Sequence, residues 1–117
     1  MLKLLFLMAF IAVPAYAQEA ISTNGAVLRA LDKVSGAARD VDVTRGQSVA
    51  VGSLTVKLND CRFPVGNPSG DAYAELEITE SGSESRLFSG WMIASSPALS
   101  ALEHPRYDVW VIRCTTS

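Results

Sequence analysis

The chain has 117 residues and a formal net charge of −2, from ten basic and twelve acidic side chains. The basic residues are scattered, so the sequence lacks the electrostatic footprint of a nucleic-acid-binding protein and the polybasic patch of a membrane-surface protein. The length suits one domain, large enough to bury a single hydrophobic core without a structural metal. We therefore expect no nucleic-acid partner and no cofactor.

Residues 1–17 have the three parts of a secretory signal peptide. Lys3 gives a basic start, residues 4–13 form an apolar run, and Ala15 and Ala17 make an A-x-A cleavage site. The run is about half of the roughly 20 residues that a membrane-spanning helix needs. The first cysteine is Cys61, which excludes a lipidated N-terminal cysteine. We expect cleavage after Ala17, export to the periplasm, and a single β-rich domain over residues 18–117 with no integral membrane segment.

Cys61 and Cys114 are the only cysteines. Export would place them in an oxidising compartment, where an even count usually means a disulfide. Closing such a loop is worth about 4 kcal/mol in the chain-entropy model. A redox-active pair is the alternative, but the C-x-x-C spacing is missing. We predict a structural Cys61–Cys114 bridge.

The first half of the mature chain alternates apolar and polar residues, as half-buried strands do. Four strands are predicted, over residues 26–33, 39–45, 48–51 and 54–59. Val41 and Val43 share a face of the second strand. Past the fourth strand the apolar phase shifts, which predicts a bulge near Asn59–Asp60 that turns Cys61 inward.

Three further strands are predicted, over residues 72–79, 86–93 and 107–114, after an exposed loop at 64–71 and another at 80–85. The first should bury the face that carries Ala72, Ala74, Leu76 and Ile78. The second is apolar on both faces, which favours a central position, and its Ser89 and Gly90 suggest close packing by a neighbour. In the third, Trp110 and Ile112 should share a face with Cys114.

One helix is predicted before the last strand. Ser96 suits the N-cap, Pro97 the first helical position, and the helix should run to Glu103 before His104-Pro105. Leu99 and Leu102 would then pack inward. Seven or so short strands and one brief helix indicate an all-β fold, a small β-sandwich or barrel.

The C-terminal half also resembles a known family. The run 88–105, followed by 107–110 and Cys114, looks like the signature of secreted bacterial proteins grouped as domain of unknown function 2155. The likeness extends to residues 28–33, 46–47, 52–54 and Cys61, so it covers nearly all of the mature chain. It implies export in a Gram-negative cell, and it implies no activity, cofactor or catalytic residue.

No motif defines a catalytic or metal site. His104 is the only histidine, so a zinc site would lack ligands, and capping of the last helical carbonyls is the simpler role for its ring. Ser95 or Ser96 with His104 and Asp108 could be written as a hydrolase triad, but the sequence has no nucleophile elbow.

Two surfaces could bind a ligand. Glu75 and Glu77, with Asp71 nearby, could suit a glycosidase or a calcium ion, although a solvated strand face with Lys57 as a cross-strand partner is the simpler reading. Aromatic residues could hold a sugar or a peptide. Trp91 and Trp110 fit the core better, which leaves Tyr73 and Tyr107 as the surface candidates.

We therefore interpret the chain as an exported, non-catalytic module that binds a protein partner or forms an accessory part of an envelope assembly. The candidate interaction rim is Glu103, His104, Arg106 and Tyr107, and His104 should be dispensable for folding. The alternatives are a hydrolase of an envelope polymer and a carbohydrate or small-ligand binder. A pocket with His104, Asp108 and a serine would favour the hydrolase, an exposed aromatic strip the carbohydrate binder, and a flat apolar patch the protein binder.

Overall fold

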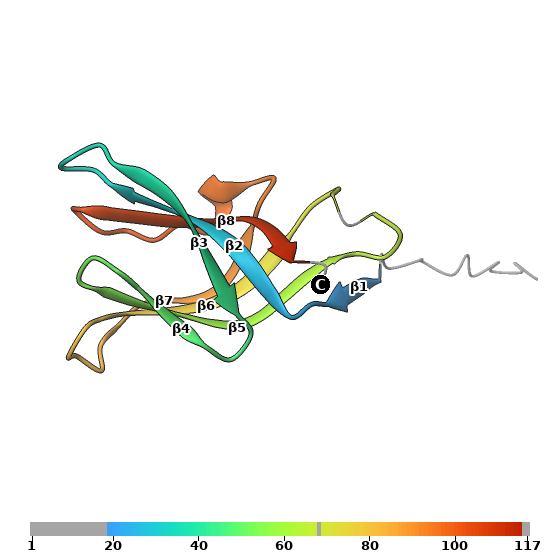
Figure 1. Cartoon of the computed structure of the whole chain (residues 1–117), viewed down its shortest axis with the longest axis horizontal. Coiled ribbons are helices and arrows are strands. Elements are labelled where there is room, and N and C mark those ends of the chain that lie inside the picture. Colours follow the sequence, from blue (N-terminus) through green and yellow to red (C-terminus); the bar gives the residue numbers. More distant parts are fainter. Residues whose placement is uncertain (1–18, 68, 116–117) are drawn as a thin grey trace, which may run out of the picture.

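The structure is a computed structural model that describes residues 19–67 and 69–115, most of which lie in β-strands (Figure 1). The expected signal peptide and its cleavage point lie outside the described residues. Two antiparallel sheets form the two layers seen in Figure 1. This arrangement confirms the all-β sandwich.

The first sheet has five strands in the order β1-β5-β6-β7, and β4 also pairs with β5. Its strands are β1 (Ala20–Ser22), β4 (Ser48–Val51), β5 (Leu54–Pro64), β6 (Tyr73–Glu80) and β7 (Arg86–Ile93). The second sheet has the order β3-β2-β8. Its strands are β2 (Gly25–Asp32), β3 (Ala38–Thr44) and β8 (Tyr107–Thr115). Only β1, three residues long, has no counterpart among the predicted strands.

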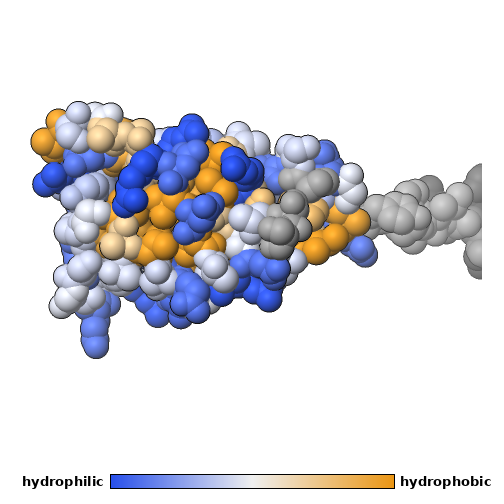
Figure 2. Space-filling model, viewed as in Figure 1, coloured by the Kyte–Doolittle hydropathy of each residue, from blue (hydrophilic) through white to orange (hydrophobic). Residues whose placement is uncertain are grey.

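The core lies between the two sheets and follows the two-residue period of the strands. The predicted face of Ala74, Leu76 and Ile78 on β6 is buried, and so is Ala72 just before it. At the edge where β3 contacts β4, the core reaches the surface through the half-buried Val41 and Val49. Figure 2 shows hydrophobic surface near the middle of the view, where β3 crosses in Figure 1, with hydrophilic side chains around it.

A bulge on β5 turns Cys61 inward, as predicted. The pairing of β5 with β6 shifts register between Leu58 and Asp60, so that Leu58 and Cys61 both face the core. Cys61 is bonded to Cys114 of β8, with 5.7 Å between their Cα atoms. The predicted disulfide is confirmed, and it joins the two sheets covalently.

The positions of the last two strands differ from the prediction. β7 is the edge strand of its sheet, where a central strand was expected. On β8, the register with β2 shifts near Ile112, so Cys114 shares the inner face with Val109 and Val111 and not with Trp110. Apolar residues on both faces did not identify a central strand here, because the outer faces of both strands carry half-exposed aromatic residues.

The predicted helix is a single 3₁₀ turn, Pro97–Leu99. Ser96 precedes it but makes no side-chain cap, and Leu99 is 77% exposed, whereas Leu102 is 4% exposed and enters the core. So short a helix gains little from its own hydrogen bonds. The segment also has to cross from β7 to β8, and the extended chain after Leu99 lets Leu102 reach the gap between the sheets.

We expect Leu102→Ala to lower the free energy of unfolding by about 2 to 5 kcal/mol, because it leaves a cavity in the core. The matched control is Leu99→Ala, which should change that free energy by less than about 0.5 kcal/mol, since the side chain is exposed. Urea unfolding of both variants measures the difference. Equal losses in the two variants would contradict this packing of the crossover segment.

Candidate functional site

The four residues of the predicted rim differ in their exposure. Glu103 and Arg106 are exposed. Tyr107 is only 8% exposed, and the His104 side chain is 11% exposed. The expectation that Tyr107 is a surface aromatic is therefore wrong. The rim divides into two residues that a partner could touch and two that hold the end of the sandwich together.

His104 uses both ring nitrogens within the chain. Its Nδ1 accepts hydrogen bonds from the backbone N–H groups of Arg106 and Tyr107, both at 3.1 Å. Because Nδ1 accepts, the ring proton of the neutral imidazole is on Nε2, which donates to Glu80 Oε1 at 2.8 Å. The helix-capping role predicted for His104 is thus replaced by a bridge from β6 to the start of β8.

Tyr107 closes the same end of the sandwich. Its ring lies against the turn between β4 and β5, where a Cβ on Gly52 would come within 2.2 Å of the ring. Gly52 also has a φ of 55°, which glycine adopts most readily. The His104 ring stacks on the Tyr107 ring with 5.5 Å between centroids, and the Arg106 guanidinium lies 5.3 Å from its centroid.

An ion pair and a lysine hydrogen bond lie beside this stack. Arg106 donates to Asp32 Oδ2 at 3.1 Å, and Lys33 donates to the His104 carbonyl oxygen. The hydrogen bond from Arg106 holds the pKa of Asp32 below its ordinary value. The hydrogen bonds from His104 and Ser53 do the same for the pKa of Glu80. These contacts join β2, the turn between β4 and β5, β6 and the start of β8 at this end of the sandwich. We call this group of residues the His104 clamp: Asp32, Gly52, Glu80, His104, Arg106 and Tyr107.

The hydrolase triad does not assemble. Ser95 Oγ donates to Asp71 Oδ2 at 2.7 Å, just before β6, whereas His104 contacts Glu80 at the far end of that strand. β6 has eight residues, which at about 3.3 Å each separates its ends by more than about 20 Å. Ser95 and His104 thus serve opposite ends of the sandwich.

The carboxylates of β6 do not gather as a binding site. Glu77 lies opposite Lys57 in the pairing of β5 with β6. It also forms an ion pair with Arg86, in which Glu77 Oε1 lies 3.6 Å from the guanidinium nitrogen. Asp71 is used by the backbone N–H groups of Ala72 and Ser95. Across residues 19–67 and 69–115, no three His, Cys, Asp or Glu side chains come together as metal ligands.

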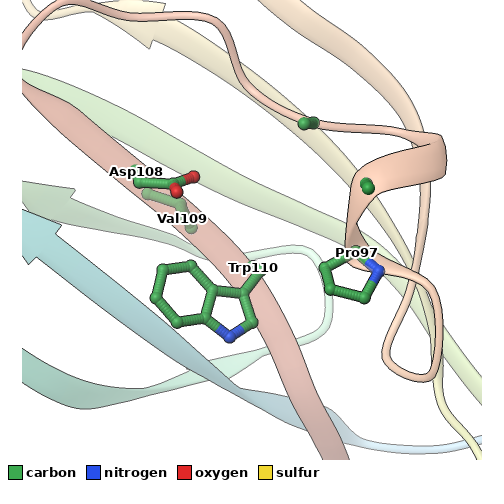
Figure 3. Close-up of a pocket in the computed structure, with 6 residues that line it drawn as sticks. Pro97, Asp108, Val109 and Trp110 are labelled. Carbon is green, nitrogen blue, oxygen red and sulfur yellow. The ribbon is translucent and has the colours of Figure 1, made fainter.

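An apolar hollow of about 320 Å³ lies between β8 and the 3₁₀ turn. Figure 3 shows the Trp110 indole of β8 and the Pro97 ring on facing sides of it, with Asp108 on the same strand. Ala98 and Ala101 complete the wall. Asp108 is the only charged residue that lines this hollow, and the other lining residues are apolar. The lining therefore contains no group of residues that could form a catalytic site.

The outer face of the five-stranded sheet carries an aromatic patch, which we define as Ala20, Arg62, Tyr73, Trp91 and Ile93. Trp91 is 37% exposed, so its predicted place in the core is wrong. Tyr73, a predicted surface candidate, lies beside it on β6, paired with Ile93. Arg62 comes from β5, opposite Tyr73. The patch lines a shallow, open depression with a volume of about 260 Å³.

Arg62 is held in place over the tryptophan. Its Cζ lies 5.2 Å from the centroid of a Trp91 ring, and its Nε donates to Asp60 Oδ2 at 2.8 Å. Asp60 Oδ2 also accepts from Ser22 Oγ of β1. The guanidinium is therefore held beside Trp91 by its ion pair with Asp60. The sequence signal for this arrangement is the bulge at Asn59, which reverses the parity of β5 and puts Arg62 outside.

These features define a disulfide-linked β-sandwich with an aromatic outer face. Over residues 26–114 the chain matches the model of a family described as uncharacterised proteins conserved in bacteria, DUF2155, and it belongs to that family. An uncharacterised protein of Rickettsia prowazekii (strain Madrid E) is 32% identical over 95 residues, which cover 79% of this chain and 61% of that protein. No solved structure matches the chain. Among the described residues, no helix has the length and apolar character needed to cross a membrane.

We expect His104→Ala to lower the free energy of unfolding by about 2 kcal/mol, because two backbone N–H groups and Glu80 lose their partner. This reverses the expectation from sequence. The neighbouring control, Glu103→Ala, should change it by less than about 0.5 kcal/mol. If thermal unfolding gives both variants the same midpoint as the parent, His104 does not hold the clamp.

The clamp should also make stability depend on pH. Asp32 and Glu80 have folded-state pKa values below their ordinary values of 3.8 and 4.5, so their stabilisation is present above those values and is lost as pH falls through the lower, folded-state ones. Asp32→Asn keeps one oxygen acceptor for the backbone N–H groups of Val34 and Ser35 but removes the charge. In urea titrations from about pH 7 to about pH 3, this variant should lose less stability than the parent. Parallel profiles would rule out a role for Asp32.

Proposed function

We propose that this protein is an exported, non-catalytic module of the bacterial cell envelope that binds a protein partner through the aromatic patch. The N-terminal sequence supports export, since residues 1–17 have the pattern of a signal peptide. The Cys61–Cys114 disulfide supports it independently, because such bonds persist in oxidising compartments such as the periplasm.

The composition of the aromatic patch carries the proposal. Tryptophan, tyrosine and arginine are the residues most often found as binding hot spots in protein interfaces, and Trp91, Tyr73 and Arg62 lie together here on one sheet face. Asp60 holds Arg62 beside Trp91, which lowers the side-chain entropy that Arg62 loses on binding. A shallow apolar surface with a fixed charge suits the face of another protein.

A carbohydrate is the second candidate, because the patch is also an exposed aromatic strip. A sugar ring stacks on the flat face of an aromatic side chain, and the Arg62 guanidinium already covers part of a Trp91 ring face. This favours protein over sugar. The hydrolase alternative has no support from geometry, since Ser95 and His104 lie far apart.

The exposed part of the predicted rim offers a second, smaller contact. Glu103 and Arg106 are accessible beside the His104 clamp, and the clamp fixes the backbone that carries them. We assign His104 and Tyr107 a supporting role at this contact, since they are mostly buried.

Crosslinking in the periplasm of cells that express a tagged chain, followed by mass spectrometry, tests the proposal. We expect Trp91→Ala to weaken partner binding about ten-fold or more, the typical cost of truncating a hot spot. Val34→Ala, which shortens an exposed apolar side chain elsewhere, should leave capture unchanged.

Two results would contradict this function. One is a partner captured equally well by the parent and by Trp91→Ala. The other is quenching of tryptophan fluorescence by envelope glycan fragments, lost in Trp91→Ala, in a chain that captures no protein. The second result would establish the carbohydrate reading instead.

A further inference from the structure

The edge strand β7 has the composition of a strand with neighbours on both sides. Its only charged residue is the first one, Arg86, and the seven others are apolar or small. Leu87 and Trp91 are both exposed. Soluble proteins usually protect edge strands with charges, bulges, prolines or short length, because an unprotected edge pairs with other chains.

The other edges of the two sheets are protected. β3 carries Arg39, Asp40 and Asp42 along its length. β1 and β4 have three and four residues. β8 carries the charged residues Asp108 and Arg113 and has a bulge near Ile112. β7 has one irregularity, at Leu87, where its pairing with β6 shifts register. Among the described residues, it is the long edge whose regular stretch, Phe88 to Ile93, carries no charge and no proline.

The direction of the free hydrogen-bonding groups on β7 follows from its ladder. The Ala94 N–H donates to Ala72 at the start of β6, so by antiparallel alternation the even-numbered residues back to Phe88 face β6. The odd-numbered residues face away, as the Ile93 carbonyl confirms by accepting from Ser96. The N–H and C=O groups of Ser89 and Trp91 thus point out from the sheet edge, and the described residues offer them no backbone partner.

We propose that β7 pairs with β7 of a second copy of this chain, antiparallel, about a two-fold axis at Gly90. Directly opposed residues in such a pair lie on the same face of the sheet, which requires positions of equal parity. Gly90 then lies opposite Gly90 of the partner subunit. Trp91 lies opposite the partner's Ser89, and both residues point their backbone groups at each other, as a hydrogen-bonded pair must.

This register is self-complementary in size, polarity and charge. On the outer face, the large Trp91 of each copy meets the small Ser89 of the other. On the inner face, Met92 meets Phe88, so apolar residues continue from one core to the next. Gly90 puts no side chain at the axis. Arg86 lies beyond this central stretch, so no like charges face each other. A slip by one residue would place residues of the outer face of one copy opposite residues of the inner face of the other.

The pairing would join two five-stranded sheets into one continuous sheet with both aromatic patches on the same outer face. It goes beyond the partner binding proposed above and needs no partner protein. Its test uses the purified chain alone, so either idea can fail without the other.

The test is sedimentation velocity combined with amide hydrogen exchange over a range of concentrations up to about 1 mM. We expect the mass to rise to twice that of the monomer. The Ser89 and Trp91 amides should become protected as it does, by ten-fold or more. The Asp40 and Asp42 amides are the internal control. Arg45 donates to Asn24 beside β2, so by alternation they face the free edge of β3 and should stay unprotected.

Ser89→Pro should abolish the dimer, because proline removes a donor that faces the free edge and breaks no bond to β6. Asp42→Pro makes the same change at the edge of β3 and should leave the dimer intact. A monomer at about 1 mM, or a dimer in which the Ser89 and Trp91 amides gain no protection, overturns the proposal. The exchange measurement on the parent decides the matter even if a proline variant does not fold. A chain that stays monomeric yet captures an extended segment of another protein at β7 also overturns it.

Discussion

The covalent bond between the sheets sets the arrangement of the rest of the molecule. Cys61 and Cys114 come from different sheets, and each faces inward because a bulge has shifted the parity of its strand. Without the bulge near Asn59, residues 60, 62 and 64 would face the core. Arg62 lies outside, over Trp91, for the same reason that Cys61 lies inside. The disulfide and the aromatic patch thus depend on one local feature of β5. In the chain-entropy model, the disulfide stabilises the folded state by about 4 kcal/mol.

The two ends of the sandwich are closed by different chemistry. One end has the disulfide, beside which the aromatic patch lies. The other end has the His104 clamp, which connects both sheets through hydrogen bonds and ring stacking. A sandwich of this size buries a small core, and each end would otherwise let water between the sheets. The only histidine and both cysteines are therefore used to close the two ends of the sandwich.

The sequence predicts the fold well where one face of a strand is clearly apolar, and less well where both faces are apolar. The buried face of β6, the bulge at Asn59 and the disulfide all follow from parity and cysteine count. Trp91 and Tyr107 were assigned opposite exposures to those observed, because periodicity places aromatic residues on a face but does not say which face of a two-sided apolar strand is covered. Whether β7 is an edge depends on the order of strands in the sheet, which is a long-range property. Of the aromatic patch, only Tyr73 was foreseen. Arg62 could also have been predicted, because a bulge that turns Cys61 inward turns the next residue outward.

The extent of the family match separates the scaffold from what surrounds it. The match begins at Ala26 and ends at Cys114, so it contains both closures of the sandwich and the whole of β7, and it leaves out β1. β1 is three exposed residues held on β5, yet its Ser22 binds Asp60, the residue that fixes Arg62, and its Ala20 lines the aromatic patch. A strand that adds nothing to the core therefore helps to form the aromatic patch. The proposed binding face therefore combines residues inside the family match, Arg62, Tyr73 and Trp91, with one residue outside it, Ala20.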